Sequence, residues 1–142
     1  MLRQGPISLT LHSLLEPVIA ALLIAAPFLF GFSDEGAPTA VAIVIGIAVL
    51  FVGMSTRWRL SLVKAIPVPV HLTIDLIVGA LLIAAPFLFG FSDDGAPTAF
   101  FLVVGVGELL AALATRWTPA DGAGAPRRRR RGRGQDESPV AG

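Results

Sequence analysis

The sequence contains no cysteine. A disulfide framework and a thiolate metal site are therefore both excluded. The sequence also has no phosphate-binding glycine loop, no nucleophile elbow and no H-E-x-x-H pattern, the short motifs typical of nucleotide, acyl-transfer and metalloprotease chemistry. These absences predict a protein that is not an enzyme and that holds no cofactor.

Charged residues are scarce, at 15% of the 142 residues, whereas 54% are hydrophobic. In a soluble domain about a quarter of the residues are charged. Apart from Glu16, Asp75, Glu108 and Arg116, the charged residues lie outside four apolar runs of the ~20 residues needed to cross a bilayer, at residues 10–31, 38–55, 70–91 and 97–116. The first run is too long for a signal-peptide core and is interpreted as a retained helix. We therefore predict an all-α membrane protein with four transmembrane helices.

The chain contains an internal duplication, with one unit repeated in tandem. Residues 21–40, ALLIAAPFLFGFSDEGAPTA, return at residues 80–99 with one change, Glu35 to Asp94. The same offset aligns further residues: His12 with His71, Glu16 with Asp75, Gly46 with Gly105, and Thr56-Arg57-Trp58 with Thr115-Arg116-Trp117. The four helices are therefore expected as two tandem direct-repeat hairpins.

Turn residues divide each unit into two helices. Gly31 suits the left-handed end of one helix, and Pro38 suits the first turn of the next. Pro27 and Pro86 recur near the ends of the first helices, where neighbouring helices can satisfy the freed carbonyl groups. Each unit is therefore interpreted as a tight helical hairpin.

The first helix is predicted to begin at Thr10 as its N-cap, with Ser13 and Glu16 at capping-box spacing as the alternative. Five segments follow from the pattern: a short N-terminus (1–9), the first repeat (10–56), a basic linker (57–69), the second repeat (70–116) and a basic tail (117–142). The tail is rich in Pro, Gly and Arg and is predicted to be disordered.

Small residues line one face of the second helix of each unit, at Gly46 and Gly53 and at Gly105 and Ala112. Such residues let membrane helices approach closely. This face is predicted to pack against another helix. The alternative is the general enrichment of glycine in membrane helices.

The eleven basic residues all fall at the termini or in the linker, and the two hairpin turns carry only acids. The positive-inside rule then predicts both termini on the cytoplasmic side of the cell membrane. Trp58 and Trp117 are expected in an aromatic belt at the inner boundary. Because each unit crosses twice, the repeats should be related by a pseudo-twofold axis along the membrane normal.

A run of five arginines lies in the tail: Arg127, Arg128, Arg129, Arg130 and Arg131. We interpret it as a lipid-surface segment, because each basic residue near an anionic inner leaflet contributes about 1 kcal/mol. A pure topology signal is the alternative. A nucleic-acid patch is the least favoured interpretation.

The polar residues of greatest interest are two pairs, His12 with Glu16 and His71 with Asp75. A separation of four places each pair on one helix face. We favour a structural role near the interface, in which the acids complement the helix dipole and the histidines stay wet. A proton relay and, if the pairs face one another, a divalent metal site are the alternatives.

Glu108 stands where the first repeat has Val49. A lone carboxylate at this depth costs about 2.5–3.5 kcal/mol on insertion scales, so it should face the bundle. We favour a hydrogen bond at a helix interface over a role in proton-coupled transport.

The repeated segment resembles the SPW repeat family of small prokaryotic membrane proteins, named for a Ser-Pro-Trp where this chain has Ala26-Pro27-Phe28 and Ala85-Pro86-Phe87. Asp75, Gly79 and LLIAAPFLFGF fit the family unit closely, and the first copy fits slightly less well. The resemblance implies two-helix repeats and no particular biochemical activity.

Two functions are compatible with the sequence. The favoured one is a structural or interaction module that packs through its small-residue faces, with a second copy or another membrane protein as partner. The alternative is a small proton- or ion-coupled transporter that uses Glu108 and the His/acid pairs. A transport path needs several buried polar positions near the midplane, and Glu108 alone qualifies.

Overall fold

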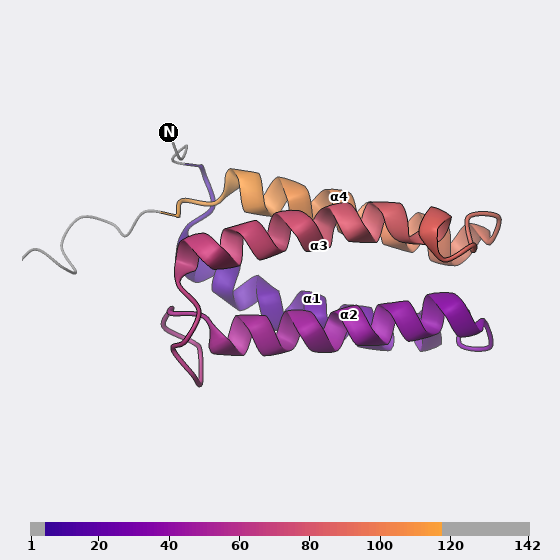
Figure 1. The fold of residues 1–142 in the computed structure, drawn as a ribbon, viewed down its shortest axis with the longest axis horizontal. Helices are drawn as coiled ribbons and strands as arrows, with labels where there is room; N and C mark the ends of the chain where they lie inside the picture. Colours follow the sequence, from indigo (N-terminus) through magenta and orange to yellow (C-terminus); the bar gives the residue numbers. More distant parts are fainter. Residues whose placement is uncertain (1–4, 118–142) are drawn as a thin grey trace, which may run out of the picture.

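The computed structural model describes residues 5–117. In this part of the chain four helices follow one another: α1 (Leu9–Leu29), α2 (Gly36–Ser55), α3 (Val68–Leu88) and α4 (Gly95–Ala114). Each helix is long and apolar enough to cross a membrane. The helices pack as an α1–α2 hairpin beside an α3–α4 hairpin (Figure 1). The prediction of four transmembrane helices in two tandem hairpins is confirmed.

The two ends of the bundle carry different segments of the chain (Figure 1). We call the end that carries residues 5–8, 56–67 and 115–117 the linker end, and the end with the turns at 30–35 and 89–94 the turn end. At the turn end, Gly31 and Gly90 adopt φ values of 74° and 72°, which a side chain would disfavour. The Thr39 hydroxyl donates to the Phe32 carbonyl oxygen at 2.8 Å. The turns are therefore closed by backbone geometry together with a side-chain hydrogen bond.

The start of α1 differs from the prediction. Ser8 is the N-cap, and its hydroxyl oxygen accepts a hydrogen bond from the Leu11 amide at 3.1 Å. The assignment of Thr10 as N-cap was wrong, and so was the alternative capping box, because the Ser13 hydroxyl donates to the Thr10 carbonyl oxygen instead. The helix begins earlier because the residue before Ser8, Ile7, is held in extended conformation by pairing with Thr115.

Within each hairpin a glycine lies in close contact with the partner helix. A methyl group on Gly46 would lie 2.8 Å from Ile24 Cγ1 and 3.0 Å from the Ala20 carbonyl oxygen. A methyl group on Gly105 would lie 2.9 Å from the Gly79 carbonyl oxygen. The small-residue faces are therefore used inside the hairpins, where close approach increases van der Waals contact.

The ends of the two repeats exchange contacts. Ile7, before α1, pairs with Thr115 after α4, and Ile66, before α3, pairs with Thr56 after α2. The segment that ends each repeat thus pairs with the segment that precedes the other repeat. This reciprocity is the contact pattern of a twofold relation between the repeats.

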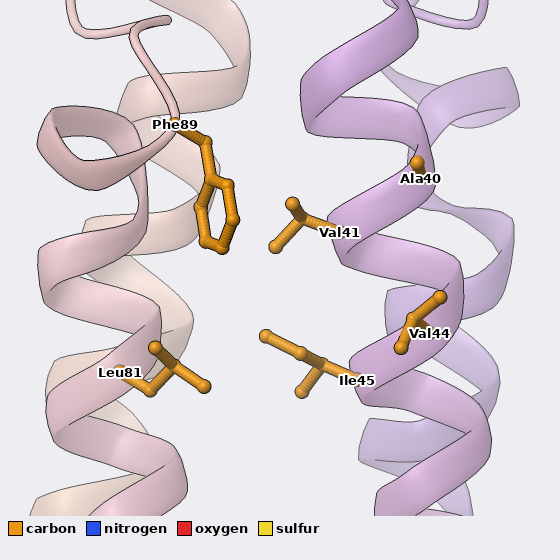
Figure 2. A pocket seen from close by; sticks show the side chains of 6 residues that line it. All are labelled: Ala40, Val41, Val44, Ile45, Leu81 and Phe89. Carbon is orange, nitrogen blue, oxygen red and sulfur yellow. The ribbon is translucent and has the colours of Figure 1, made fainter.

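A groove of about 320 Å³ lies between α2 and α3 (Figure 2). In Figure 2, Leu81 and Phe89 on the α3 side face Val41 and Ile45 of α2. Ala40 and Val44 complete the lining, so every side chain there is hydrocarbon. Such a groove offers no hydrogen-bond partner to an ion or polar ligand, and the candidate site lies elsewhere.

Candidate functional site

The two predicted His/acid pairs meet between the hairpins near the linker end. His12 and Glu16 come from α1, and His71 and Asp75 come from α3. The four contacts form a ring: His12 Nε2 to Glu16 Oε1 at 3.2 Å, His12 Nε2 to Asp75 Oδ2 at 3.3 Å, His71 Nε2 to Glu16 Oε1 at 3.4 Å, and His71 Nε2 to Asp75 Oδ1 at 3.1 Å. Each histidine therefore contacts its own carboxylate and that of the other repeat.

The prediction that the two histidines stay wet was wrong. His12 is 2% exposed and His71 is 0% exposed, and both acids are buried as well. Glu16 and Asp75 are each the eighth residue of their helix, beyond the first turn where a carboxylate complements the helix dipole. Burial follows because the two pairs cover one another, which a reading of either pair alone does not reveal.

Two threonines orient the imidazole rings. Thr56 Oγ1 lies 2.8 Å from His71 Nδ1, and Thr115 Oγ1 lies 3.1 Å from His12 Nδ1. Each threonine hydroxyl donates its one proton to the carbonyl oxygen four residues earlier, at 2.7 Å. The hydroxyl oxygen must therefore accept from Nδ1–H, and this assigns the tautomer. In a neutral ring the Nε2 lone pair then points at the carboxylates.

Two tryptophans pack edge-on against the histidines. The ring centroids of Trp58 and His71 are 4.3 Å apart, and those of Trp117 and His12 are 4.9 Å apart. Trp117 Nε1 donates to the Ala112 carbonyl oxygen at 2.7 Å. Both indoles are buried, so they do not form the exposed aromatic belt that the sequence predicted. They cover the histidines because the chain after α2 and α4 turns back over the cluster.

Sequence reasoning missed the threonines and misplaced the tryptophans. The signal that could have found them is the Thr-Arg-Trp tripeptide that follows the second helix of both repeats. A tripeptide repeated at the same offset as the His/acid pairs indicates a shared structural task. The sequence could not show that each tripeptide serves the histidine of the other repeat.

Glu16 and Gly53 are complementary in size. A methyl group on Gly53 would lie 3.3 Å from Glu16 Oε2 and 3.4 Å from Glu16 Cβ. The second repeat has the shorter Asp75 and, at the position of Gly53, Ala112. The repeat with the longer acidic side chain, Glu16, thus has glycine at the facing position, and the repeat with the shorter Asp75 has alanine there.

We expect Gly53→Ala to be less harmful in a Glu16→Asp background than in the wild-type chain. Asp is shorter by one methylene and leaves room for the added methyl group, as in the second repeat. A double-mutant cycle of unfolding free energies should give a favourable coupling of about 0.5–3 kcal/mol. Strictly additive effects would show that the two positions do not share this space.

Glu108 is buried in α4 and lines a cavity of about 320 Å³ between α1 and α4. His12 and Glu16 line the same cavity. Glu108 is not a member of the four-residue cluster. The structure thus brings Glu108 near the cluster without including it.

The remaining predicted residues occupy other places. Pro27 and Pro86 are fully buried within α1 and α3, toward the turn end. Gly46, Gly53, Gly105 and Ala112 are buried. The arginine cluster at 127–131 lies outside the described residues.

The cluster can hold charge in two ways. Two imidazolium rings would balance two carboxylates, or one divalent cation would balance them with both rings neutral. One ligand atom from each of the four residues lies within 4.8 Å of the others. In both states the cluster links the two hairpins.

Comparison with protein-family models finds the SPW repeat domain over residues 10–115. A comparison with curated proteins and one with solved structures returned no match. The matched region contains the cluster and all four helices except the first residue of α1.

Proposed function

The chain belongs to the SPW repeat family, and on this premise we propose that it is a membrane interaction module and not an enzyme. The observation that supports the proposal is that the polar and small residues contact one another inside the chain, which leaves apolar side chains on the outside. The small-residue faces and the polar cluster make contacts inside the chain. The outward surfaces of all four helices are apolar, with exposed positions such as Val18, Phe51, Ile77 and Leu110. Such surfaces contact lipid or another membrane protein.

The transport alternative has less support, because the polar groups do not continue across the described part of the bundle. Glu108 and the cluster lie in the half nearer the linker end. The core of the other half contains buried apolar side chains: Leu23, Phe32, Leu82, Phe91 and Phe101. An ion crossing this half would have no polar partner among them, which is costly in a membrane.

The partners proposed are a second copy or another membrane protein, with anionic lipid at the arginine cluster of the tail. We place the linker end on the cytoplasmic side of the cell membrane. Arg57, Arg59, Lys64 and Arg116 all lie at that end and are exposed, and the positive-inside rule supports this orientation. Nucleic acid is not proposed as a partner, because the arginine cluster of the tail is tethered beside the membrane and meets anionic lipid more directly.

Single-cysteine variants test the module, since the chain has no cysteine of its own. Val18→Cys, Phe51→Cys, Ile77→Cys and Leu110→Cys place a thiol at equivalent outward positions on the four helices. In intact membranes, a bifunctional maleimide should link the chain to a second copy or to one partner from a subset of these positions. The buried Leu23→Cys is the matched control and should give no adduct.

The proposal fails if all four outward positions give only monomer, or equal traces of collisional product. The orientation is read in the same experiment with Ser33→Cys in the first turn and Leu62→Cys in the linker. A membrane-impermeant maleimide added outside the cell should label Ser33→Cys and leave Leu62→Cys unlabelled.

A further inference from the structure

The distances in the buried cluster suit a shared metal ion better than direct ion pairs. Charge-assisted N–H···O hydrogen bonds are about 2.7–2.9 Å long, whereas the four N···O distances are 3.1–3.4 Å. With metal–ligand bonds of about 2.0–2.1 Å, the edges of a tetrahedron around zinc are about 3.3 Å long. The histidine–carboxylate separations are therefore close to those of neighbouring ligands around one ion, with Asp75 contributing Oδ2 to one contact and Oδ1 to the other, and one ligand atom from each of the four residues lies within 4.8 Å of the others.

The histidine nitrogens that point into the cluster lack hydrogen-bond partners. His12 Nε2, His71 Nε2 and Asp75 Oδ2 are all buried and make no hydrogen bond in the described structure, although oppositely charged groups lie nearby. Buried polar atoms without partners are rare and call for an explanation. An ion at the centre of the ring would satisfy all three.

The donor set selects the class of ion. Two imidazoles and two carboxylates suit zinc and its first-row neighbours, whereas Mg²⁺ and Ca²⁺ prefer oxygen ligands. The two carboxylates neutralise the charge of a divalent ion, which a buried site requires. We propose that His12, Glu16, His71 and Asp75 bind one divalent transition-metal ion of the zinc class.

The residues around the ligands match the arrangement expected of a metal site. Metal-binding histidines donate their second N–H to a fixed acceptor, which orients the ring and sets its tautomer. Thr56 and Thr115 supply these acceptors for His71 and His12. Each threonine comes from the opposite hairpin to the histidine that it holds.

The proposed ion joins the two halves of the molecule. Glu16 and His12 belong to the first repeat, and His71 and Asp75 belong to the second, so each hairpin contributes two ligands. Contacts between the hairpins are few in comparison with those inside them. A bound ion would therefore hold the hairpins together at the linker end. This inference does not depend on whether the outward surfaces bind a partner.

Metal titration of the untagged full chain in lipid nanodiscs tests the site. Co²⁺ alone should bind one ion per chain with the intense visible absorption of tetrahedral cobalt, and Zn²⁺ should displace it while Mg²⁺ in the same excess does not. The two tryptophans against the histidines provide a second signal, because bound Co²⁺ should quench their fluorescence. A His71→Gln chain should lose at least about 100-fold in Co²⁺ affinity, more than outer residues contribute.

Matched variants distinguish the loss of a metal ligand from misfolding of the protein. Glu108→Gln removes a nearby buried carboxylate that is not a ligand and should leave the cobalt spectrum and affinity unchanged. Thr56→Val should weaken binding by about 10–100-fold, the effect of losing an outer partner, and Thr56→Ser should restore it. Helical circular dichroism and monodisperse elution show which variants are folded.

The proposal is overturned if the wild-type chain binds no Co²⁺ or Zn²⁺, if the spectrum is that of octahedral cobalt, or if folded His71→Gln binds as well as wild type. If His71→Gln does not fold, the comparison of Thr56→Val with Thr56→Ser decides. Equal binding by these two variants would then reject the site.

Discussion

Replacing Gly105 with valine is expected to lower the free energy of unfolding by about 2–3 kcal/mol, at the upper end of the cost of overpacking. The first carbon of any side chain there would lie 2.9 Å from both the Gly79 carbonyl oxygen and the Ile83 amide nitrogen. These are backbone atoms of α3, so a rotamer change cannot relieve the clash. The helices must separate, and the van der Waals contact between them is lost. Unfolding in mixed micelles at increasing denaturing detergent would measure the loss.

The matched control for this substitution is Gly107→Val, on the same helix two residues away. A methyl group on Gly107 would meet nothing within 4 Å. The two variants share the change in helix propensity and differ in the helix contact. Equal losses of stability would show that the close contact between α3 and α4 at Gly105 is not the cause of the destabilisation.

Replacing Asp75 with asparagine should destabilise the protein by about 3–5 kcal/mol, the usual cost of leaving a buried charge unpaired. Asp75 contacts His71 through Oδ1 and His12 through Oδ2. Together with Glu16, it offsets either two imidazolium rings or a bound divalent cation, so the direction of the effect is the same in both states. Thermal unfolding in nanodiscs would measure it.

Neutralising the whole cluster should cost less than this single change. The variant with His12→Gln, Glu16→Gln, His71→Gln and Asp75→Asn leaves no charge in the cluster, and replacing a complete buried ionic group is often close to neutral. Its stability should exceed that of Asp75→Asn alone, although it carries three more substitutions. Losses that increase with each substitution would show that the residues do not act as one charged unit.

The effects of the Gly105 and Asp75 substitutions both depend on contacts with other helices. The sequence indicated that these two residues matter, but it did not identify the residues that they contact. The face with Gly105 was predicted to pack against another helix, and the structure assigns that helix to its own hairpin. The acid at Asp75 was paired with His71 by spacing, and the structure adds His12 from the other repeat.

The architecture could be predicted from the sequence because it depends on local properties. Runs of about twenty apolar residues determine where the chain crosses a membrane, and Gly31 and Pro38 mark where it turns back. The repeat at residues 21–40 and 80–99 makes the two hairpins equivalent. The family resemblance, now supported over residues 10–115, rests on the same local pattern.

The candidate site depended on tertiary structure because its members come from different parts of the chain. Spacing of four residues along one helix places His12 beside Glu16, yet it says nothing about which residue approaches from another helix. The exchange of partners between repeats buries both histidines, places Thr115 on His12 across 103 residues of sequence, and covers the rings with tryptophan. Hydropathy and helical periodicity describe single segments. The docking of one hairpin on the other determines whether four polar residues are solvated or form one enclosed cluster.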